Sequence, residues 1–241
     1  MAQKTVVRSS QCVNVPEEVD DITLAAMADP GMSAWVALES RAKLARGETV
    51  LVNGATGSAG TMAVQIAKHL GAKKVIATGR NQQALKTLLS IGADEVIPLE
   101  DDSKPPEAAF RKQFEQGVDI VLDYLWGPSA ERIIAAVSAR EKKDPIRFVQ
   151  IGTASEPNIT LPGAVLRASA IQIIGSGIGS VALEDITGIL SKLMQAAPAV
   201  GFKIATKAVP LCRIGEVWSI ESVTPRIVFT MSSHLGAGGS A

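Results

Sequence analysis

A glycine-rich segment between a strand and a helix constrains the fold of this chain more than any other feature. Residues 54–60 read Gly-Ala-Thr-Gly-Ser-Ala-Gly, after the β-branched run at residues 49–53 and at the start of an amphipathic stretch at residues 58–70. A glycine-rich turn that leaves a strand and opens a helix is the setting in which a backbone can approach the phosphates of a dinucleotide. The segment therefore predicts a strand–turn–helix unit of an α/β domain.

Each glycine of this segment has its own role in that unit. Gly54 permits the tight turn, Gly57 removes a side chain that would keep a pyrophosphate away, and Gly60 lets the helix pack closely on the sheet. The amides of Ser58 and Ala59 then face phosphate oxygens from the positive end of the helix dipole. The alternative is a tight strand–helix turn that holds no ligand.

The alternation of strand and helix continues to about residue 197. The predicted strands are residues 49–53, 74–78, 95–98, 118–123, 147–151 and 170–174. The predicted helices are residues 58–70, 82–89, 107–114, 129–139 and 183–197. Apolar strands separated by helices predict a parallel sheet covered on both faces, which with right-handed crossovers is a doubly wound α/β fold.

The two ends of the chain do not follow this alternation. The elements predicted there are helices at residues 22–27 and 32–44, broken at Asp29-Pro30-Gly31, then a strand within residues 203–211, a short helix around residues 215–221 and a strand at residues 226–230. The last ten residues predict a disordered tail. These flanking pieces belong to a unit other than the sheet.

Charge, cysteine content and hydropathy exclude several classes of function. Lys plus Arg and Asp plus Glu both number 24, so no net charge attracts nucleic acid or an anionic membrane. Cys12 and Cys212 show no CxxC spacing, which favours a reducing compartment. The N-terminus lacks the apolar core of a secretory signal, and glycines and acids interrupt the most apolar late stretch. We expect a cytoplasmic protein with a small-molecule substrate, and neither nucleic acid nor membrane as partner.

Arg80 decides which dinucleotide the sequence predicts. About twenty residues after the glycines, an NAD site places an Asp or Glu on the ribose hydroxyls. The second predicted strand instead ends in Gly79-Arg80-Asn81, with no carboxylate at that place. A guanidinium can bind a 2′-phosphate through two hydrogen bonds, whereas an acid would repel it. We expect NADP(H) as the cofactor; the alternative is a solvent-facing arginine at a strand end.

Several segments, in one order along nearly the whole chain, resemble the medium-chain dehydrogenase/reductase family. The likeness is to its zinc-free, quinone-oxidoreductase-like branch, whose members are alcohol dehydrogenase-like. The segments that carry it are GMSAW at 31–35, GETVLV at 47–52, ATGSAG at 55–60, QIAK at 65–68, GADEV at 92–96, VPL at 209–211 and RIV at 226–228.

This resemblance implies a Rossmann dinucleotide-binding domain beside a GroES-like substrate domain. It implies hydride transfer between NADPH and a quinone, an enone or another carbonyl compound in the cleft between the two. The residues that it places on the cofactor are Ala55, Thr56, Gly57, Ser58, Ala59 and Gly60 at the pyrophosphate, Gly79 and Arg80 at the adenosine ribose, and Tyr124, Leu125, Gly152, Thr153, Ser176, Gly177 and Ile178 at the nicotinamide end.

The chain departs from the family pattern because most of the substrate domain is missing. The predicted domains are a remnant with linking helices at 1–44, the Rossmann domain at 45–200, a return to the substrate domain at 201–231 and a tail at 232–241. The alternative function is a non-catalytic NADPH-binding module or scaffold. Because a missing half leaves strand edges and apolar surface uncovered, we also expect a homodimer or a larger homo-oligomer.

Two other chemistries find little support in the residues. A zinc site needs Cys and His at ligand spacing, and the two cysteines and two histidines, at positions 12, 69, 212 and 234, are scattered. We therefore expect no metal. A methyltransferase can use the same kind of sheet, but its cofactor has no pyrophosphate for the glycine turn to hold.

No nucleophile–base pair is evident. The Tyr-x-x-x-Lys pair of short-chain dehydrogenases is absent, because Tyr124 is followed by Leu-Trp-Gly-Pro. Tyr124 is nevertheless a candidate catalytic donor at the end of a strand, with packing beside Trp126 as the alternative. Asp123 is expected to cap a loop amide. In this reaction class the cofactor performs the chemistry and the protein orients it.

Overall fold

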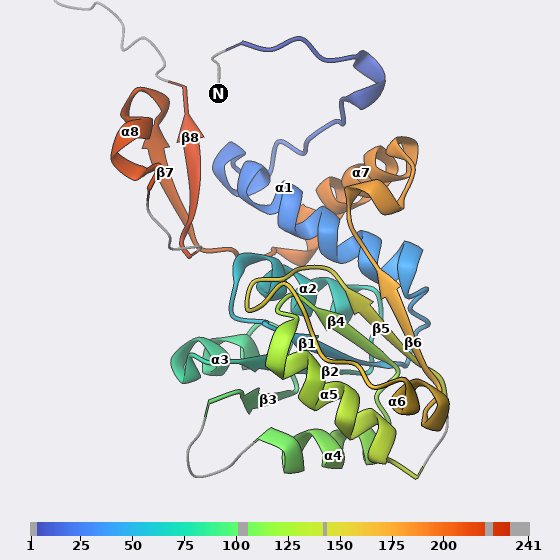
Figure 1. Ribbon diagram of the computed structural model, residues 1–241. Coiled ribbons are helices and arrows are strands. Elements are labelled where there is room, and N and C mark those ends of the chain that lie inside the picture. The colour runs from blue at the N-terminus through green and yellow to red at the C-terminus, as the bar shows by residue number, and fades with distance from the viewer. Residues whose placement is uncertain (1–3, 101–105, 142–143, 220–223, 232–241) are drawn as a thin grey trace, which may run out of the picture.

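The computed structural model describes residues 4–100, 106–141, 144–219 and 224–231. Its main feature is a sheet of six parallel strands in the order β3-β2-β1-β4-β5-β6 (Figure 1). The strands are β1 (Thr49–Asn53), β2 (Lys74–Gly79), β3 (Glu95–Pro98), β4 (Ile120–Asp123), β5 (Ile146–Gln150) and β6 (Ile171–Gly175). The chain winds outward from β1 to β3, then returns beside β1 at β4 and winds the other way. This order confirms the predicted doubly wound sheet.

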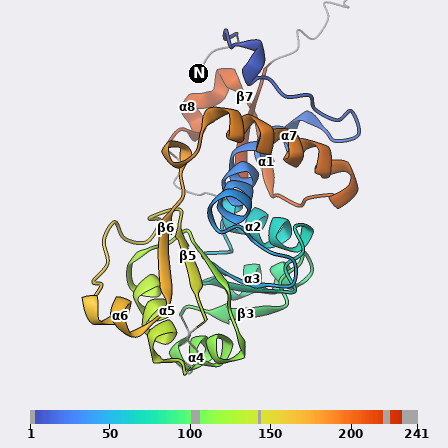
Figure 2. The ribbon, with the colours of Figure 1, turned by 90° about the vertical axis from the view of Figure 1, so that its right-hand side faces the viewer.

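Helices cover both faces of the sheet (Figure 2). Those on one face are α1 (Asp21–Trp35), α2 (Ser58–His69), α3 (Gln82–Leu89) and α7 (Leu183–Val200), and those on the other are α4 (Pro106–Gln116), α5 (Gly127–Ala139) and α6 (Gly163–Ala168). In β1, Val50 and Val52 pack against the first group and Leu51 against the second. Alternate side chains of a strand point to opposite faces, so a strand buried on both faces is apolar throughout. Among the described residues, no helix is both long and apolar enough to cross a membrane.

The two helices predicted before the sheet form one continuous helix, so the predicted break is wrong. α1 runs through Pro30 and is followed by the π-helical turn η2 (Val36–Arg41). A proline inside a helix removes one hydrogen bond and costs about 3 kcal/mol. Pro30 and Gly31 are nevertheless buried, and a Cβ atom on Gly31 would lie 2.6 Å from Cδ2 of Leu193. Close packing of α1 on α7 therefore overrides the local helix-breaking signal.

Beyond α7 the chain leaves the main sheet. β7 (Thr206–Pro210) and β8 (Arg226–Thr230) pair in parallel as a separate sheet, with η4 (Leu211–Arg213) and α8 (Ile214–Val217) between them. An ion pair of 2.9 Å between Arg226 and Asp29 ties β8 to α1. Both strands were predicted, and the helix expected around residues 215–221 is the shorter α8. The predicted tail lies outside the described residues, and the predicted domain limits stay predictions.

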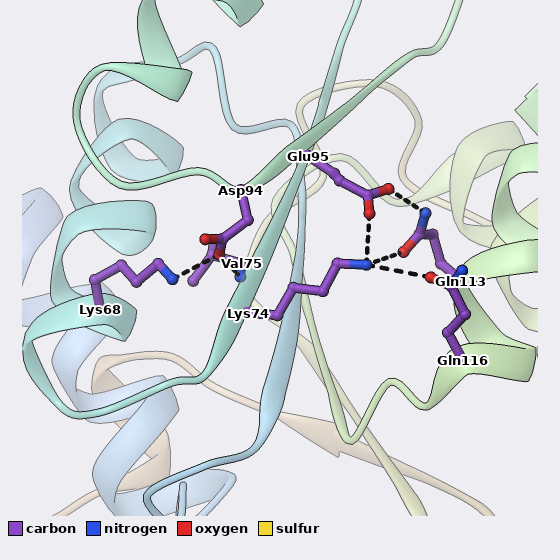
Figure 3. Close-up of polar contacts among 7 residues, drawn as sticks. All are labelled: Lys68, Lys74, Val75, Asp94, Glu95, Gln113 and Gln116. Atoms are coloured by element: carbon purple, nitrogen blue, oxygen red, sulfur yellow. Dashed lines mark hydrogen bonds and ion pairs between the residues drawn. The ribbon is translucent and has the colours of Figure 1, made fainter.

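A polar cluster fastens the amino ends of β2 and β3 (Figure 3). Lys74 Nζ lies 2.7 Å from Glu95 Oε1 and donates to Gln113 Oε1 of α4 at 2.7 Å. Beside it, Asp94 accepts from the amide of Val75 at 2.6 Å and pairs with Lys68 at 2.6 Å. These contacts join β2 and β3 to α2 and α4 at the amino ends of the strands, opposite to the glycine-rich turn. They therefore help to fix the register between β2 and β3.

Candidate functional site

The glycine-rich turn, residues 54–60, forms a closed loop after β1; we call it the phosphate loop. Gly54 has φ +85°, and a Cβ atom on it would lie 2.8 Å from Cγ of Leu125. A Cβ atom on Gly60 would lie 2.4 Å from the carbonyl oxygen of Gly54, so α2 packs directly on the loop. At Gly57 the nearest atom to a Cβ would be 3.9 Å away. Gly54 and Gly60 are therefore required by packing within the protein, whereas Gly57 faces space that a ligand can enter.

Backbone contacts hold the phosphate loop against β2. The amide of Ala55 donates to the carbonyl of Thr78 at 2.8 Å, and the Thr61 hydroxyl donates to the carbonyl of Ala55 at 3.2 Å. Gly57 is the cap residue of α2 and brings no side-chain oxygen to the first amides of the helix. Ser58 and Ala59 begin α2, as predicted, at the positive end of its dipole.

A cavity of about 360 Å³ lies beside this loop, between the start of α2, the middle and end of α3, and residues 203–205. Thr56, Ser58 and Thr61 line one side, and Leu88 and Lys203 contribute to the opposite walls. The loop therefore borders open space rather than packed core, which leaves room for a ligand at the end of the helix.

The end of β2 brings Gly79 and Arg80 next to the phosphate loop. A Cβ atom on Gly79 would lie 2.5 Å from Cγ2 of Thr56, so the Thr56 side chain packs directly on the backbone of Gly79. The Arg80 side chain is 77% exposed and lies 3.8 Å from the Glu100 carboxylate, itself 69% exposed. Such an exposed pair is weak. The guanidinium thus stands at the rim of the site, where it can turn toward a ligand.

Sequence reasoning missed a buried polar belt beneath these loops, formed by Asn53, Thr78, Asp123 and Ser129. The Thr78 hydroxyl donates to Asn53 Oδ1 at 2.7 Å, and Asn53 Nδ2 donates to Asp123 Oδ1 at 2.8 Å and to Ser129 Oγ at 2.9 Å. Asn53, Thr78 and Asp123 are each the last or next-to-last residue of an apolar strand. A polar residue at the end of three neighbouring apolar strands was the signal that could have revealed them.

Asp123 caps loop amides, as predicted. Its carboxylate accepts from the amide of Leu125 at 3.1 Å and from the amide of Trp126 at 3.2 Å. Burial raises the pKa of Asp123, and hydrogen bonds from Asn53 and from the two amides oppose that rise. All of these partners are donors, which suits the ionised carboxylate.

The predicted nicotinamide-end residues gather at the same edge of the sheet. Leu125 follows β4 and lies against Gly54. Gly152, followed by the exposed Thr153, donates its amide to the carbonyl of Asp123 at 3.2 Å. Ser176, Gly177 and Ile178 follow β6 and line a hollow of about 110 Å³ against α1. The topology therefore brings together residues that are far apart in sequence.

Tyr124 lies in the buried core rather than in an open cleft. It is 8% exposed and packs in the cluster beneath α1 and α2. Burial raises the pKa of the Tyr124 hydroxyl, and only Ser33 of α1 opposes this. Within the described residues the hydroxyl has no hydrogen-bond partner of ordinary geometry. This position favours the packing role over the catalytic one.

His69, Cys12 and Cys212 lie in the described part of the chain. His69 ends α2 and packs beside Trp35 and Phe202, with ring centroids 5.4 and 6.3 Å apart. Cys12 and Cys212 are free and exposed. Within the part of the chain that the structure describes, no group of three His, Cys, Asp or Glu side chains could hold a metal ion.

Comparison with known proteins agrees with this geometry. The family model described as zinc-binding dehydrogenase matches residues 59–205. A protein of Emericella nidulans named "Probable NADPH-dependent quinone reductase tdiC" is 31% identical over 217 residues, which are 85% of this chain and 60% of that protein. The chain thus spans about three fifths of this relative.

Solved structures share the fold. A mycobacterial quinone oxidoreductase superposes with a TM-score of 0.72 at 22% identity, covering 86% of this chain and 63% of the other. An NAD-dependent alcohol dehydrogenase gives a TM-score of 0.69 at 24% identity, covering 84% and 55%. The α/β fold class, with a doubly wound Rossmann sheet, is therefore confirmed. The chain belongs to the zinc-binding dehydrogenase family, in the quinone-oxidoreductase-like branch of the medium-chain dehydrogenases/reductases.

Proposed function

We propose that the chain binds NADPH at the carboxyl edge of its sheet and serves an oxidoreductase that transfers hydride to a quinone, an enone or another carbonyl compound. The observation that carries the proposal is the pairing of the phosphate loop with Arg80. Gly57 leaves space for a pyrophosphate, and an exposed guanidinium stands at the end of β2 where an NAD site has an acid. The family includes NADPH- and NAD-dependent proteins by name, so Arg80 is the discriminating residue.

In this proposal the described residues of the site bind and orient the cofactor. When bound, NADPH supplies a hydride from C4 of its nicotinamide. The first amides of α2 bind the pyrophosphate, and Arg80 binds the 2′-phosphate. Leu125, Gly152 and Ser176 would line the nicotinamide end of the cofactor.

A titration of NADPH and NADH by nicotinamide fluorescence tests the cofactor assignment. We expect the wild type to prefer NADPH and Arg80→Ala to lose about tenfold in NADPH affinity, with NADH binding unchanged. Arg213→Ala is the control, because Arg213 is also exposed and ion-paired, with Glu216, but lies beyond β7. Equal affinity for the two nucleotides, or equal effects of both variants, would contradict the assignment.

The second candidate function is a binding module without turnover. It is favoured by the burial of Tyr124, the candidate catalytic donor, which is 8% exposed. NADPH oxidation with quinones, enones and aldehydes separates the two. Binding without oxidation of any of them supports the module, and oxidation supports the enzyme.

Self-association is also a proposal. Among the described residues, β6 pairs with β5 alone, and Ile173 in its middle is 37% exposed. An edge strand without charged side chains can pair with a second copy. Light scattering tests this, and a monodisperse monomer would contradict it.

A further inference from the structure

Three neighbouring strands end in polar residues at the same level of the sheet. Asn53 lies beside Asp123 in the pairing of β1 with β4, and Thr78 follows the β2 residue that pairs with Val52. None of these three side chains is exposed. β1 continues into the phosphate loop, β2 into Gly79 and Arg80, and β4 into the turn at residues 123–127, which we call the nicotinamide-end turn. The polar belt thus lies beneath all three parts of the proposed cofactor site.

Hydrogen bonds connect the phosphate loop to the nicotinamide-end turn through this belt. The amide of Gly54 donates to Thr78 Oγ1 at 3.2 Å, Thr78 donates to Asn53, and Asn53 donates to Asp123. Asp123 in turn accepts from the amides of Leu125 and Trp126. The first three steps join different segments of the chain, and the last joins Asp123 to the turn that follows it, so the chain of hydrogen bonds links the two loops.

The nicotinamide-end turn has a backbone that needs such support. Trp126 has φ +59° and ψ −157°, a conformation that a bulky L-residue rarely adopts. Conformations of this kind cost about 1–3 kcal/mol and persist where the surroundings enforce them. Both oxygens of the Asp123 carboxylate accept from the amide of Trp126, at 3.2 Å each. The carboxylate therefore holds the turn in its strained shape.

The stability of the fold does not require these buried polar side chains. Burying a carboxylate and an amide at the ends of three apolar strands is costly, and apolar side chains of similar size would pack there instead. The polar groups add directional contacts that apolar side chains lack, because each hydrogen bond fixes the position of one segment relative to the next.

We propose that Asn53 and Asp123 are positioning residues that set the nicotinamide-end turn at a fixed place relative to the phosphate loop. The proposal rests on the proposed NADPH site. It assigns the adenosine half of the cofactor to the phosphate loop and the seating of the nicotinamide half to the carboxylate of Asp123, acting through the amides of Leu125 and Trp126.

Two ligands separate these roles: NADPH, and adenosine 2′,5′-bisphosphate, which lacks the nicotinamide. In Asp123→Asn an NH₂ group replaces one carboxylate oxygen beside the amide of Trp126. We expect the fragment to bind within twofold of wild type, NADPH affinity to fall about tenfold, and the fluorescence anisotropy of the bound nicotinamide to decrease. In Thr78→Val the amide of Gly54 loses its acceptor, so both ligands bind more weakly, and Thr78→Ser restores both.

Asp119→Asn is the matched control at the other end of β4. Asp119 accepts from the amide of Thr49 at 2.8 Å, so its loss also removes a strand-to-strand contact but lies far from the loops. We expect it to lower the melting temperature without changing either affinity. If Asp123→Asn does not fold, Asn53→Ala, which removes the side-chain donor to Asp123, provides the test with the same two ligands, and an equal loss of affinity for both overturns the proposal.

The outcomes also separate this proposal from the proposed function. A wild-type chain that binds neither ligand overturns both. Suppose that the wild-type chain binds NADPH more tightly than adenosine 2′,5′-bisphosphate. If Asp123→Asn then keeps the same ratio of these two affinities and the same anisotropy of the bound nicotinamide, the positioning role alone is overturned. A parallel loss for both ligands in Asp123→Asn, matching its loss of stability, assigns Asp123 a structural role and also overturns the proposal.

Discussion

A Cβ atom on Gly60 would lie 2.4 Å from the carbonyl oxygen of Gly54, so the first and last glycines of the phosphate loop are in direct contact. Gly57, between them, has no such neighbour within 3.9 Å. The three glycines of this motif are therefore needed for two different reasons. Two are required by the fold, and the third is required only if a ligand approaches.

This difference predicts opposite results for two alanine variants. Gly60→Ala forces backbone to move, and we expect it to lower the free energy of unfolding by about 2 kcal/mol and to weaken NADPH binding as a consequence. Gly57→Ala brings its Cβ only within ordinary van der Waals distance, 3.9 Å, of the nearest described atom, so we expect its stability to be unchanged while NADPH affinity falls about tenfold or more. Urea unfolding and fluorescence titration measure the two quantities.

Gly188→Ala serves as the control for both variants. Gly188 lies inside α7 with nothing within 4 Å of its Cβ position, so alanine there should stabilise the helix by about 0.5–1 kcal/mol and leave binding alone. Unchanged NADPH affinity in a folded Gly57→Ala protein would mean that the loop is only a turn.

The contact between β2 and the phosphate loop can be tested by rescue. Gly79→Ala places a Cβ atom 2.5 Å from Cγ2 of Thr56, and we expect a loss of about 1–2 kcal/mol of stability. Thr56→Ala removes the obstructing methyl group, so the double variant should regain most of that loss. Additive effects in a double-mutant cycle, measured by thermal unfolding, would show that the Thr56 side chain does not pack on Gly79.

The fold could be predicted from the sequence where the signal is periodic. All six strands of the main sheet were predicted because each is a short apolar run bounded by turn residues. α1 was not, because the Asp29-Pro30-Gly31 sequence is a local breaking signal, while the packing of Gly31 against Leu193 is a contact across about 160 residues. Local patterns cannot report such a contact.

The loops of the candidate site could be predicted from the sequence, but the polar belt beneath them could not. Glycine spacing and family likeness identified the residues at the rim. The belt beneath them depends on the strand order β2-β1-β4, which brings Thr78, Asn53 and Asp123 side by side. That order is a property of the assembled sheet, so the sequence shows a polar residue at the end of each strand but not that the three residues lie side by side.

Glu100 predicts a way to strengthen the preference for NADPH. Its carboxylate lies 3.8 Å from the Arg80 guanidinium and competes with a 2′-phosphate for it. Glu100→Gln removes both the competition and the repulsion. Because both side chains are exposed, we expect a gain of only about two- to fivefold in NADPH affinity, shrinking as salt is added, with no gain for NADH. An equal gain for both nucleotides would exclude a role of the 2′-phosphate.

The cluster at Lys74 and Glu95 predicts how stability depends on pH. The hydrogen bond from Lys74 is the main cause that lowers the pKa of Glu95 below its ordinary value of 4.5, with burial opposing it. A lowered folded-state pKa means that this stabilisation is present above pH 4.5 and is lost as the pH falls through the lowered value. Lys74→Met should therefore destabilise the protein at pH 7 by about 0.5–1 kcal/mol, discounted because Glu95 is 41% exposed, and by less at pH 3.

Glu95→Gln is the background that isolates this effect. With glutamine at position 95 there is no carboxylate to titrate, although Lys74 keeps its contacts with Gln113 and Gln116 (Figure 3). In that background the cost of Lys74→Met should be small and equal at pH 7 and pH 3. Chemical unfolding of the four proteins at both pH values measures it. A cost of Lys74→Met that stays constant with pH in the wild-type background would show that Glu95 is not the partner responsible, and that the lysine stabilises the sheet through the two glutamines.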